Sequence, residues 1–241
     1  MNSNKKTQNL KKTTAIAMFA ALAYICVVII RIPNIGGFLT LDFKDVIITI
    51  GAMFFGPIAA VVLAVLVPLL EFLTVSGTGV YGLIMNFISS FTFAFVASVI
   101  YKYKKNLVGA IIGLLSAVLS VTAIMMLANL WITPYYTGMP TAAVAALIPK
   151  LLLPFNLTKA ILNAALTMML YKPLTNILKK TRLYIAPKEN ENTIQKDKRT
   201  AKIRSILIFA ISLVIVIVAV CVILVVWNGQ ISFFDIFKSK S

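Results

Sequence analysis

The sequence contains no histidine, two cysteines and only seven acidic residues among its 241 positions. Without histidine, a Ser-His-Asp triad or a Cys-His nucleophile is impossible, and so is a zinc site of mixed cysteine and histidine ligands. The cysteines, Cys26 and Cys221, lie in separate apolar runs and do not make a disulfide framework. We therefore predict no catalytic residues, no metal site, no cofactor and no enzymatic activity.

The sequence also lacks a phosphate-binding loop of the Gly-x-x-x-x-Gly-Lys-Ser/Thr type, which excludes an ATPase of that class. Charged residues make up 12% of the chain, against about 25% in a typical soluble domain, while 60% of the residues are apolar. We therefore expect a multi-pass protein of the cell membrane, in contact with membrane lipid. Its 23 lysines and arginines lie between apolar stretches, so we interpret them as topology signals and expect no binding to nucleic acid.

Apolar segments long enough to cross a bilayer as helices divide the chain into five predicted parts. The expected fold is an all-α integral membrane bundle of six transmembrane helices plus one additional C-terminal transmembrane helix. The run after residue 12 is too long for a signal peptide and is expected to remain as the first helix. The parts are a basic N-terminus (1–12), the six-helix domain (13–182), a polar linker (183–202), the extra helix (203–227) and a tail (228–241).

Within the six-helix domain, turn residues place the helix boundaries. The pair Gly56-Pro57 divides one apolar stretch into a short helix ending at Phe55 and a longer helix starting at Pro57. Arg31 to Gly37 is expected to be a loop, and the segment 39–41 continues it. The predicted helices cover residues 13–30, 46–55, 57–74, 81–101, 107–130 and 153–171.

Lysine and arginine concentrate before the first helix, between the fourth and fifth, and in residues 172–204. With six helices these three segments lie on one side of the membrane, which the positive-inside rule makes cytoplasmic. The N-terminus is then cytoplasmic, and the polar residues at the opposite helix ends face outward. They are expected to line a pocket open to the outside.

Three charges stand between the first two predicted helices, where each needs a cap, a partner or a ligand because charge near hydrocarbon is costly. Asp42 and Asp45 have the spacing of a capping box, so we interpret Asp42 mainly as the start of the second helix. Glu71 is the only acidic residue inside a predicted span, and we expect it to pair with a lysine or a backbone donor.

Asn156, Lys159 and Asn163 share one helix face through their i, i+3, i+7 spacing, which is not typical of a lipid-facing helix. Lys159 has a second interpretation, in which its amine merely reaches the outer headgroups. Asn86 and Asn129 either hydrogen-bond between helices or line the pocket. Such a pocket suits a flat, hydrogen-bonding small molecule.

Residues 13–182 resemble the substrate-binding S component of an energy-coupling factor (ECF) vitamin transporter, most closely the riboflavin-specific type. The order and spacing of several short motifs carry the resemblance. They are Ala17-Met-Phe-Ala-Ala21, Leu41-Asp42-Phe43-x-Asp45-Val46 before Gly51 and Phe55-Gly56-Pro57, Asn86-Phe-Ile-Ser-Ser90, Asn129 before Ile132-Thr133-Pro134-Tyr135-Tyr136, and Leu153-Pro154-Phe155-Asn156-Leu157-x-Lys159.

The resemblance implies capture of riboflavin, with delivery through a T component and two ATPase subunits. It also implies that Asn129, Asn156 and Lys159 hydrogen-bond the polar edge of the isoalloxazine ring, covered by the segment 39–41. An amide suits that edge because it offers both a donor and an acceptor. The complete predicted substrate-binding set is Leu39, Thr40, Leu41, Asp42, Glu71, Gly79, Asn86, Asn129, Asn156, Lys159 and Asn163.

Ala17 and Ala21 lie four residues apart on one face of the first helix, which lets another helix approach closely. By itself this spacing fits either packing inside the protein or docking of another subunit, and the resemblance implies docking on the T component. Two other functions remain open at this stage. One is an S component for thiamine, biotin or a pyridoxal-type vitamin, and the other is a membrane scaffold or enzyme without transport activity.

Overall fold

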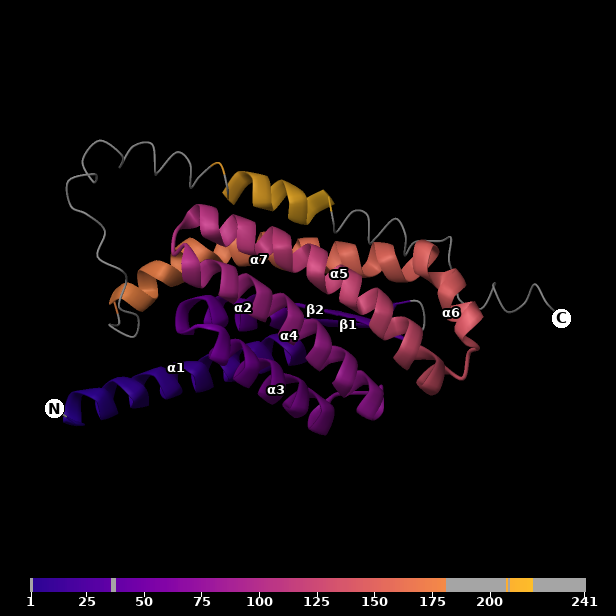
Figure 1. Ribbon diagram of the computed structural model, residues 1–241, viewed down its shortest axis with the longest axis horizontal. Helices are drawn as coiled ribbons and strands as arrows, with labels where there is room; N and C mark the ends of the chain where they lie inside the picture. Colours follow the sequence, from indigo (N-terminus) through magenta and orange to yellow (C-terminus); the bar gives the residue numbers. More distant parts are fainter. Residues whose placement is uncertain (1, 36–37, 181–206, 208, 219–241) are drawn as a thin grey trace.

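A computed structural model describes residues 2–35, 38–180, 207 and 209–218. Its helices run roughly along the long axis of the molecule, and α1 projects beyond the others at its N-terminal end (Figure 1). Two short strands form a hairpin between α1 and α2. The elements are α1 (Asn2–Ile29), β1 (Arg31–Ile35), β2 (Leu39–Asp42), α2 (Lys44–Phe55), α3 (Pro57–Thr74), α4 (Gly79–Tyr103), α5 (Leu107–Thr137), α6 (Thr141–Leu147), the π-helical turn η1 (Ile148–Leu152) and α7 (Leu153–Lys180).

Each of the six predicted helices has a counterpart in the described part of the chain. Five helical segments there are long and apolar enough to cross a membrane. The exception is α2, whose 12 residues span only about 18 Å and are almost all buried within the bundle. The prediction of six spanning helices is therefore not confirmed. The N-terminal boundary also differs, because α1 already begins within the predicted polar segment 1–12.

The break between α2 and α3 lies where the sequence placed it. Gly56 adopts a φ of 95°, a left-handed conformation that costs a glycine little, and Pro57 opens α3 at a position where its missing N–H is not needed. Because of this sharp turn, α2 and α3 can pack against each other although they are adjacent in sequence. The predicted break at Gly56-Pro57 is confirmed.

The segment predicted as a loop after the first helix is instead an antiparallel hairpin. Arg31 pairs with Asp42 and Ile32 with Leu41, with an irregularity before the Ile35–Leu39 pair. The alternation of apolar and polar residues at 39–42 is short, and the proline and glycines before it favour a loop assignment from sequence. Pairing between the two strands supplies the hydrogen bonds that the sequence alone does not reveal.

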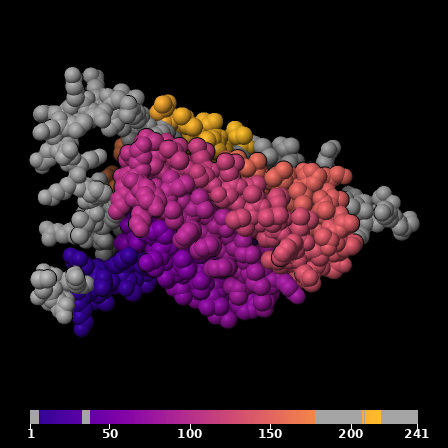
Figure 2. Space-filling model, in the orientation of Figure 1, coloured from indigo at the N-terminus to yellow at the C-terminus, as the bar shows by residue number. Residues whose placement is uncertain are grey.

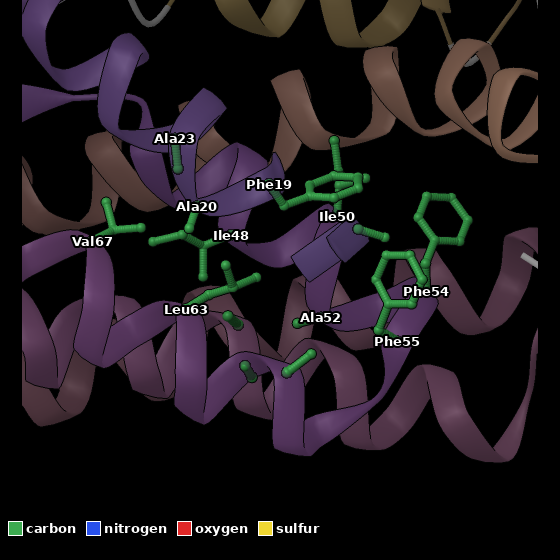
Figure 3. Packing of buried hydrophobic residues seen from close by; sticks show 14 of the residues in the cluster. Phe19, Ala20, Ala23, Ile48, Ile50, Ala52, Phe54, Phe55, Leu63 and Val67 are labelled. Carbon is green, nitrogen blue, oxygen red and sulfur yellow. The ribbon is translucent and has the colours of Figure 1, made fainter. Parts of the chain in front are cut away.

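The main apolar core lies where α1, α2 and α3 meet (Figure 3). Phe19 of α1 packs edge-on against Phe55 of α2, with ring centroids 5.9 Å apart. Ala20 and Ala23 are buried on the same side of α1, and their small side chains allow α1 to approach α2 and α3 closely. Since α1 contributes its large core residue from this face, its opposite face is left exposed.

Ala17 and Ala21 lie on the exposed face of α1. The interpretation that they pack inside this protein is therefore wrong, whereas docking of another subunit is still compatible with their position. In the space-filling view, the N-terminal part of α1 protrudes from the packed body of the molecule (Figure 2). This leaves part of the helix surface available to another protein or to lipid.

The predicted additional helix 203–227 is described only in part. Phe209–Val218 forms a short apolar helix, and Val216 packs against a small cluster that contains Leu41 of the hairpin and Leu162 of α7. The rest of the predicted helix, the linker 183–202 and the tail 228–241 lie outside the described residues.

Gly113 of α5 lies at a close contact between α4 and α5. A Cβ atom at this position would lie 2.9 Å from the backbone oxygen of Ala97, so the helices would have to separate. We expect Gly113→Ala to lower the free energy of unfolding by about 1–3 kcal/mol, as overpacking typically does. Thermal unfolding of the purified protein in detergent measures the effect.

Gly77 provides the matched control, because a Cβ atom there meets nothing within 4 Å. Gly77→Ala should change the free energy of unfolding by no more than about 0.5 kcal/mol. Equal stability of the two variants would show that α4 and α5 tolerate a wider separation than the packing implies.

Candidate functional site

A cavity opens beside the hairpin, between β1–β2, α4, α5 and α7. Its volume is about 70 Å³, and the cleft as a whole, with its open mouth, encloses about 620 Å³. The narrow inner space means that a drug-sized ligand has to displace lining side chains. The lining residues are Arg31, Phe38, Leu39, Thr40, Thr78, Gly82, Met85, Asn86, Ser89, Met125, Asn129, Tyr136, Phe155, Asn156 and Lys159.

The structure brings part of the predicted substrate-binding set together at this cavity. Four of the predicted residues, Asn86, Asn129, Asn156 and Lys159, place amide or ammonium groups on its wall from three different helices. Two more, Leu39 and Thr40, contribute to it from β2. Sequence spacing could pair Asn156 with Lys159 on one helix, but only the packing of α5 against both α4 and α7 brings the other two amides to them.

The other predicted residues do not line this cavity. Leu41 is buried in the small apolar cluster against Leu162, and Gly79 begins α4 with a left-handed φ of 62°. Asp42 and Glu71 are buried in a charged cluster beside the cavity. Their side chains do not line the cavity in this structure, and their place in the substrate-binding set stays a prediction.

Asn163 contributes to a second, smaller space of about 10 Å³. This space shares Ser89, Asn156 and Lys159 with the main cavity and is bounded by Asp45 on another side. Ser90 donates a hydrogen bond to Asp45, which satisfies one of its carboxylate oxygens. Asn163 therefore lies next to the main cavity rather than on its wall.

The charged cluster is centred on Lys44, whose side chain is 1% exposed. Its Nζ lies 2.9 Å from Asp42 Oδ2 and 3.0 Å from Glu71 Oε2, and it donates to Asn86 Oδ1 at 3.1 Å. The predicted pairing of Glu71 with a lysine is confirmed. Because removal of one member would leave an uncompensated buried charge, these groups depend strongly on one another.

The interpretation of Asp42 as a helix cap is wrong. Phe43 occupies the N-cap position of α2, and no side chain caps this end. The helix begins one residue later than the capping-box spacing requires, so Asp42 lies on β2 and turns its carboxylate toward two lysines. Asp45 does lie in the first turn of α2, where a negative charge is favourable.

Lys159 also binds Asp42. Its Nζ lies 3.0 Å from Asp42 Oδ2 and donates to the backbone oxygen of Thr40 at 3.3 Å, so it ties α7 to the hairpin. With a side chain only 12% exposed, it does not reach toward headgroups, and that interpretation is wrong. Burial by itself would raise the pKa of Asp42, but the charges of Lys159 and Lys44 together outweigh it and hold this pKa well below its usual value.

The asparagines differ in how their amides are used. Asn129 donates to the backbone oxygen of Met125 and accepts from Thr133, both on its own helix, so it does not connect two helices. Asn156 likewise donates to the backbone oxygen of Leu152. Asn86 does connect two helices, because it accepts from Lys44 of α2. Each amide keeps hydrogen-bonding capacity for a ligand.

Sequence reasoning missed several aromatic and basic residues of the cavity. Tyr136 was not among the predicted binding residues, yet it lines the cavity and packs edge-on against Phe38 and face-on against Tyr81. Arg31 also lines it and donates to the backbone oxygen of Val75 at the end of α3. A doublet of tyrosines after a proline was the available signal for Tyr136, whereas nothing in the sequence distinguished Arg31 from a flanking topology charge.

Comparison with known proteins gives concordant matches. The family described as ECF transporter, substrate-specific component, matches residues 11–171. The riboflavin transporter RibU of Staphylococcus aureus (strain TCH60) is 32% identical over 189 residues, covering 75% of this chain and 100% of that protein. The riboflavin transporter FmnP of Bacillus subtilis (strain 168) is 25% identical over 162 residues, covering 63% and 85%. A solved structure of the S component of a bacterial ECF transporter superposes with a TM-score of 0.60 at 31% identity, covering 71% of this chain and 99% of that one.

Proposed function

Because this chain belongs to the family of ECF transporter substrate-specific components, we propose that it binds riboflavin and mediates its uptake across the cell membrane. The observation that carries the proposal is the match to a riboflavin transporter over that protein's entire length. The second curated relative is also a riboflavin transporter. A substrate-binding subunit, and not an enzyme, is the role that this family implies.

The chemistry of the cavity supports this ligand. The isoalloxazine ring is flat and carries alternating carbonyl and N–H groups along one edge, which asparagine amides can match. Asn129, Asn156 and Lys159 are the residues proposed to meet that edge, while Phe38, Tyr136 and Phe155 supply aromatic surface. Leu39 and Thr40 on β2 line the cavity as well and are the residues proposed to cover the ring.

The charge distribution supports an orientation in the membrane. The N-terminus of α1, the connection from α4 to α5 and the end of α7 gather at one end of the bundle (Figure 1). These segments carry most of the lysines near the helix ends, so we place this end in the cytoplasm. The hairpin and the cavity are then on the outer side, where an uptake protein meets its ligand.

Energy for transport has to come from other subunits, because the sequence lacks an ATP-binding loop. We propose that a T component and two ATPase subunits supply it, as in other transporters of this family. The exposed small-residue face around Ala17 and Ala21 is the proposed docking surface for the T component. Small side chains at that face let a partner helix approach closely within the membrane.

Riboflavin binding can be tested on the purified protein. Material from cells grown with riboflavin should be yellow and show flavin absorbance, and titration of ligand-free protein should quench riboflavin fluorescence at sub-micromolar concentration. Thiamine, biotin and pyridoxal should not compete. A colourless protein that leaves riboflavin fluorescence unchanged would overturn the proposal, and competition by one of the other vitamins would reassign the substrate.

A further inference from the structure

The Lys44 ammonium carries three N–H donors and no acceptor, and three acceptors surround it. They come from different elements: Asp42 from β2, Glu71 from α3 and Asn86 from α4. Lys44 does not line the cavity, but two of its partners connect it to the cavity wall. Lys44 therefore donates hydrogen bonds to Asp42 and Asn86 and forms an ion pair with Glu71, so three separate elements determine its position.

One of these connections runs through Asn86. Lys44 can only donate, so Asn86 must turn its carbonyl oxygen toward Lys44. The NH₂ group of Asn86 then faces away from Lys44, on a residue that lines the cavity. Within the described part of the chain, this NH₂ group donates to no protein acceptor. Asn86 consequently keeps its N–H donors available for a ligand.

The other connection runs through Asp42. A single carboxylate oxygen, Oδ2, binds both Lys44 and Lys159. Because the charge of Asp42 is shared, Lys159 is held less tightly than in a simple pair. With Asp42 and the backbone oxygen of Thr40 as its protein partners, Lys159 keeps a third N–H for a ligand.

We propose that Lys44 is a positioning residue for ligand binding, which makes Asn86 and Lys159 present hydrogen-bond donors to the acceptor atoms of the ligand. The proposal rests on riboflavin being that ligand. This part of the cavity then offers N–H donors to the ligand. A ligand must place carbonyl or imine acceptors there, and riboflavin carries both.

The test compares wild-type protein with Lys44→Met/Glu71→Gln, which removes one positive and one negative charge and so keeps the net charge of the cluster. Without Lys44, Asn86 is free to turn its amide, and Asp42 draws Lys159 fully toward itself. We expect the affinity for riboflavin to fall about tenfold to a hundredfold. The infrared carbonyl bands of the flavin that still binds should shift, because their hydrogen-bond donors have changed.

Two further variants control for the loss of a distant hydrogen bond and for the loss of the Lys44 charge. Tyr101→Phe removes another hydrogen bond, the one between the hydroxyl groups of Tyr101 and Tyr171, away from the cavity, and should change neither affinity nor carbonyl bands. Lys44→Arg preserves the charge but replaces a compact ammonium by a planar group. It provides the measurement if the double variant fails to fold, and it should still shift the carbonyl bands.

Wild-type affinity and wild-type bands in the folded Lys44 variants would overturn the inference. Lower affinity with unchanged bands would overturn it as well, since Lys44 would then support only the fold. A wild-type protein that fails to bind riboflavin would instead overturn the proposed function, and this inference with it.

Discussion

Leucine at both Ala17 and Ala21 is expected to abolish riboflavin uptake into cells while the purified protein still binds riboflavin. Both alanines lie on the exposed face of α1, opposite the residues that pack into the core. Two added side chains would hold a docking helix away, and overpacking of this kind typically costs about 1–3 kcal/mol at each site. Uptake of labelled riboflavin by cells that contain the energising subunits measures the first effect, and fluorescence quenching measures the second.

The matched control is Ala123→Leu, which adds the same side chain at an exposed alanine of α5. It should leave both uptake and binding unchanged, because this position is not part of the proposed docking face. Normal uptake by the Ala17/Ala21 double variant would show that this face of α1 is not the docking surface. Loss of binding in that variant would mean that this face supports the cavity after all.

Lys159→Met is expected to lower the affinity for riboflavin about a hundredfold, a loss of about 2.8 kcal/mol. The substitution removes the donor proposed to meet the ligand, frees the backbone oxygen of Thr40 and takes one of two lysines from Asp42. Removing one partner from a buried charged pair commonly costs about 2–5 kcal/mol, so the expected loss is within that range. Fluorescence titration of purified protein gives the affinity directly.

Lys102→Met is the control, since Lys102 is an exposed lysine in the last turn of α4. It should bind riboflavin as tightly as the unchanged protein. If Lys159→Met also bound normally, Lys159 would serve only to hold the hairpin, and the ligand contacts would have to come from the asparagines alone.

The membrane class, the helix positions and the break at Gly56-Pro57 could be predicted because they depend on local properties. Long apolar runs and the backbone preferences of glycine and proline act over a few residues, whatever the rest of the chain does. The face shared by Asn156, Lys159 and Asn163 follows from helix geometry in the same way. Even so, Asn163 turned out to lie beside the cavity and not on it.

The structure of the charged stretch from Asp42 to Asp45 could not be predicted from the sequence. Its spacing predicted a capped helix, and the composition around it predicted a loop, but a shift of one residue in the start of α2 makes Asp42 part of a strand. Aspartate occurs both in capping boxes and in buried ion pairs, so the residue type does not distinguish them. Only the positions of Lys44 and Lys159 relative to Asp42 distinguish them, and Lys159 is 117 residues away in the chain.

The sequence by itself therefore determined that this protein is a helical membrane protein, and which residues were available for a ligand. The tertiary structure alone decided which of them meet, because side chains from β2, α4, α5 and α7 converge only after the helices have packed. It also decided that the two carboxylates of Asp42 and Glu71 pair with the two ammonium groups of Lys44 and Lys159 inside the bundle. Burial makes that pairing necessary, and burial is a property of the whole fold.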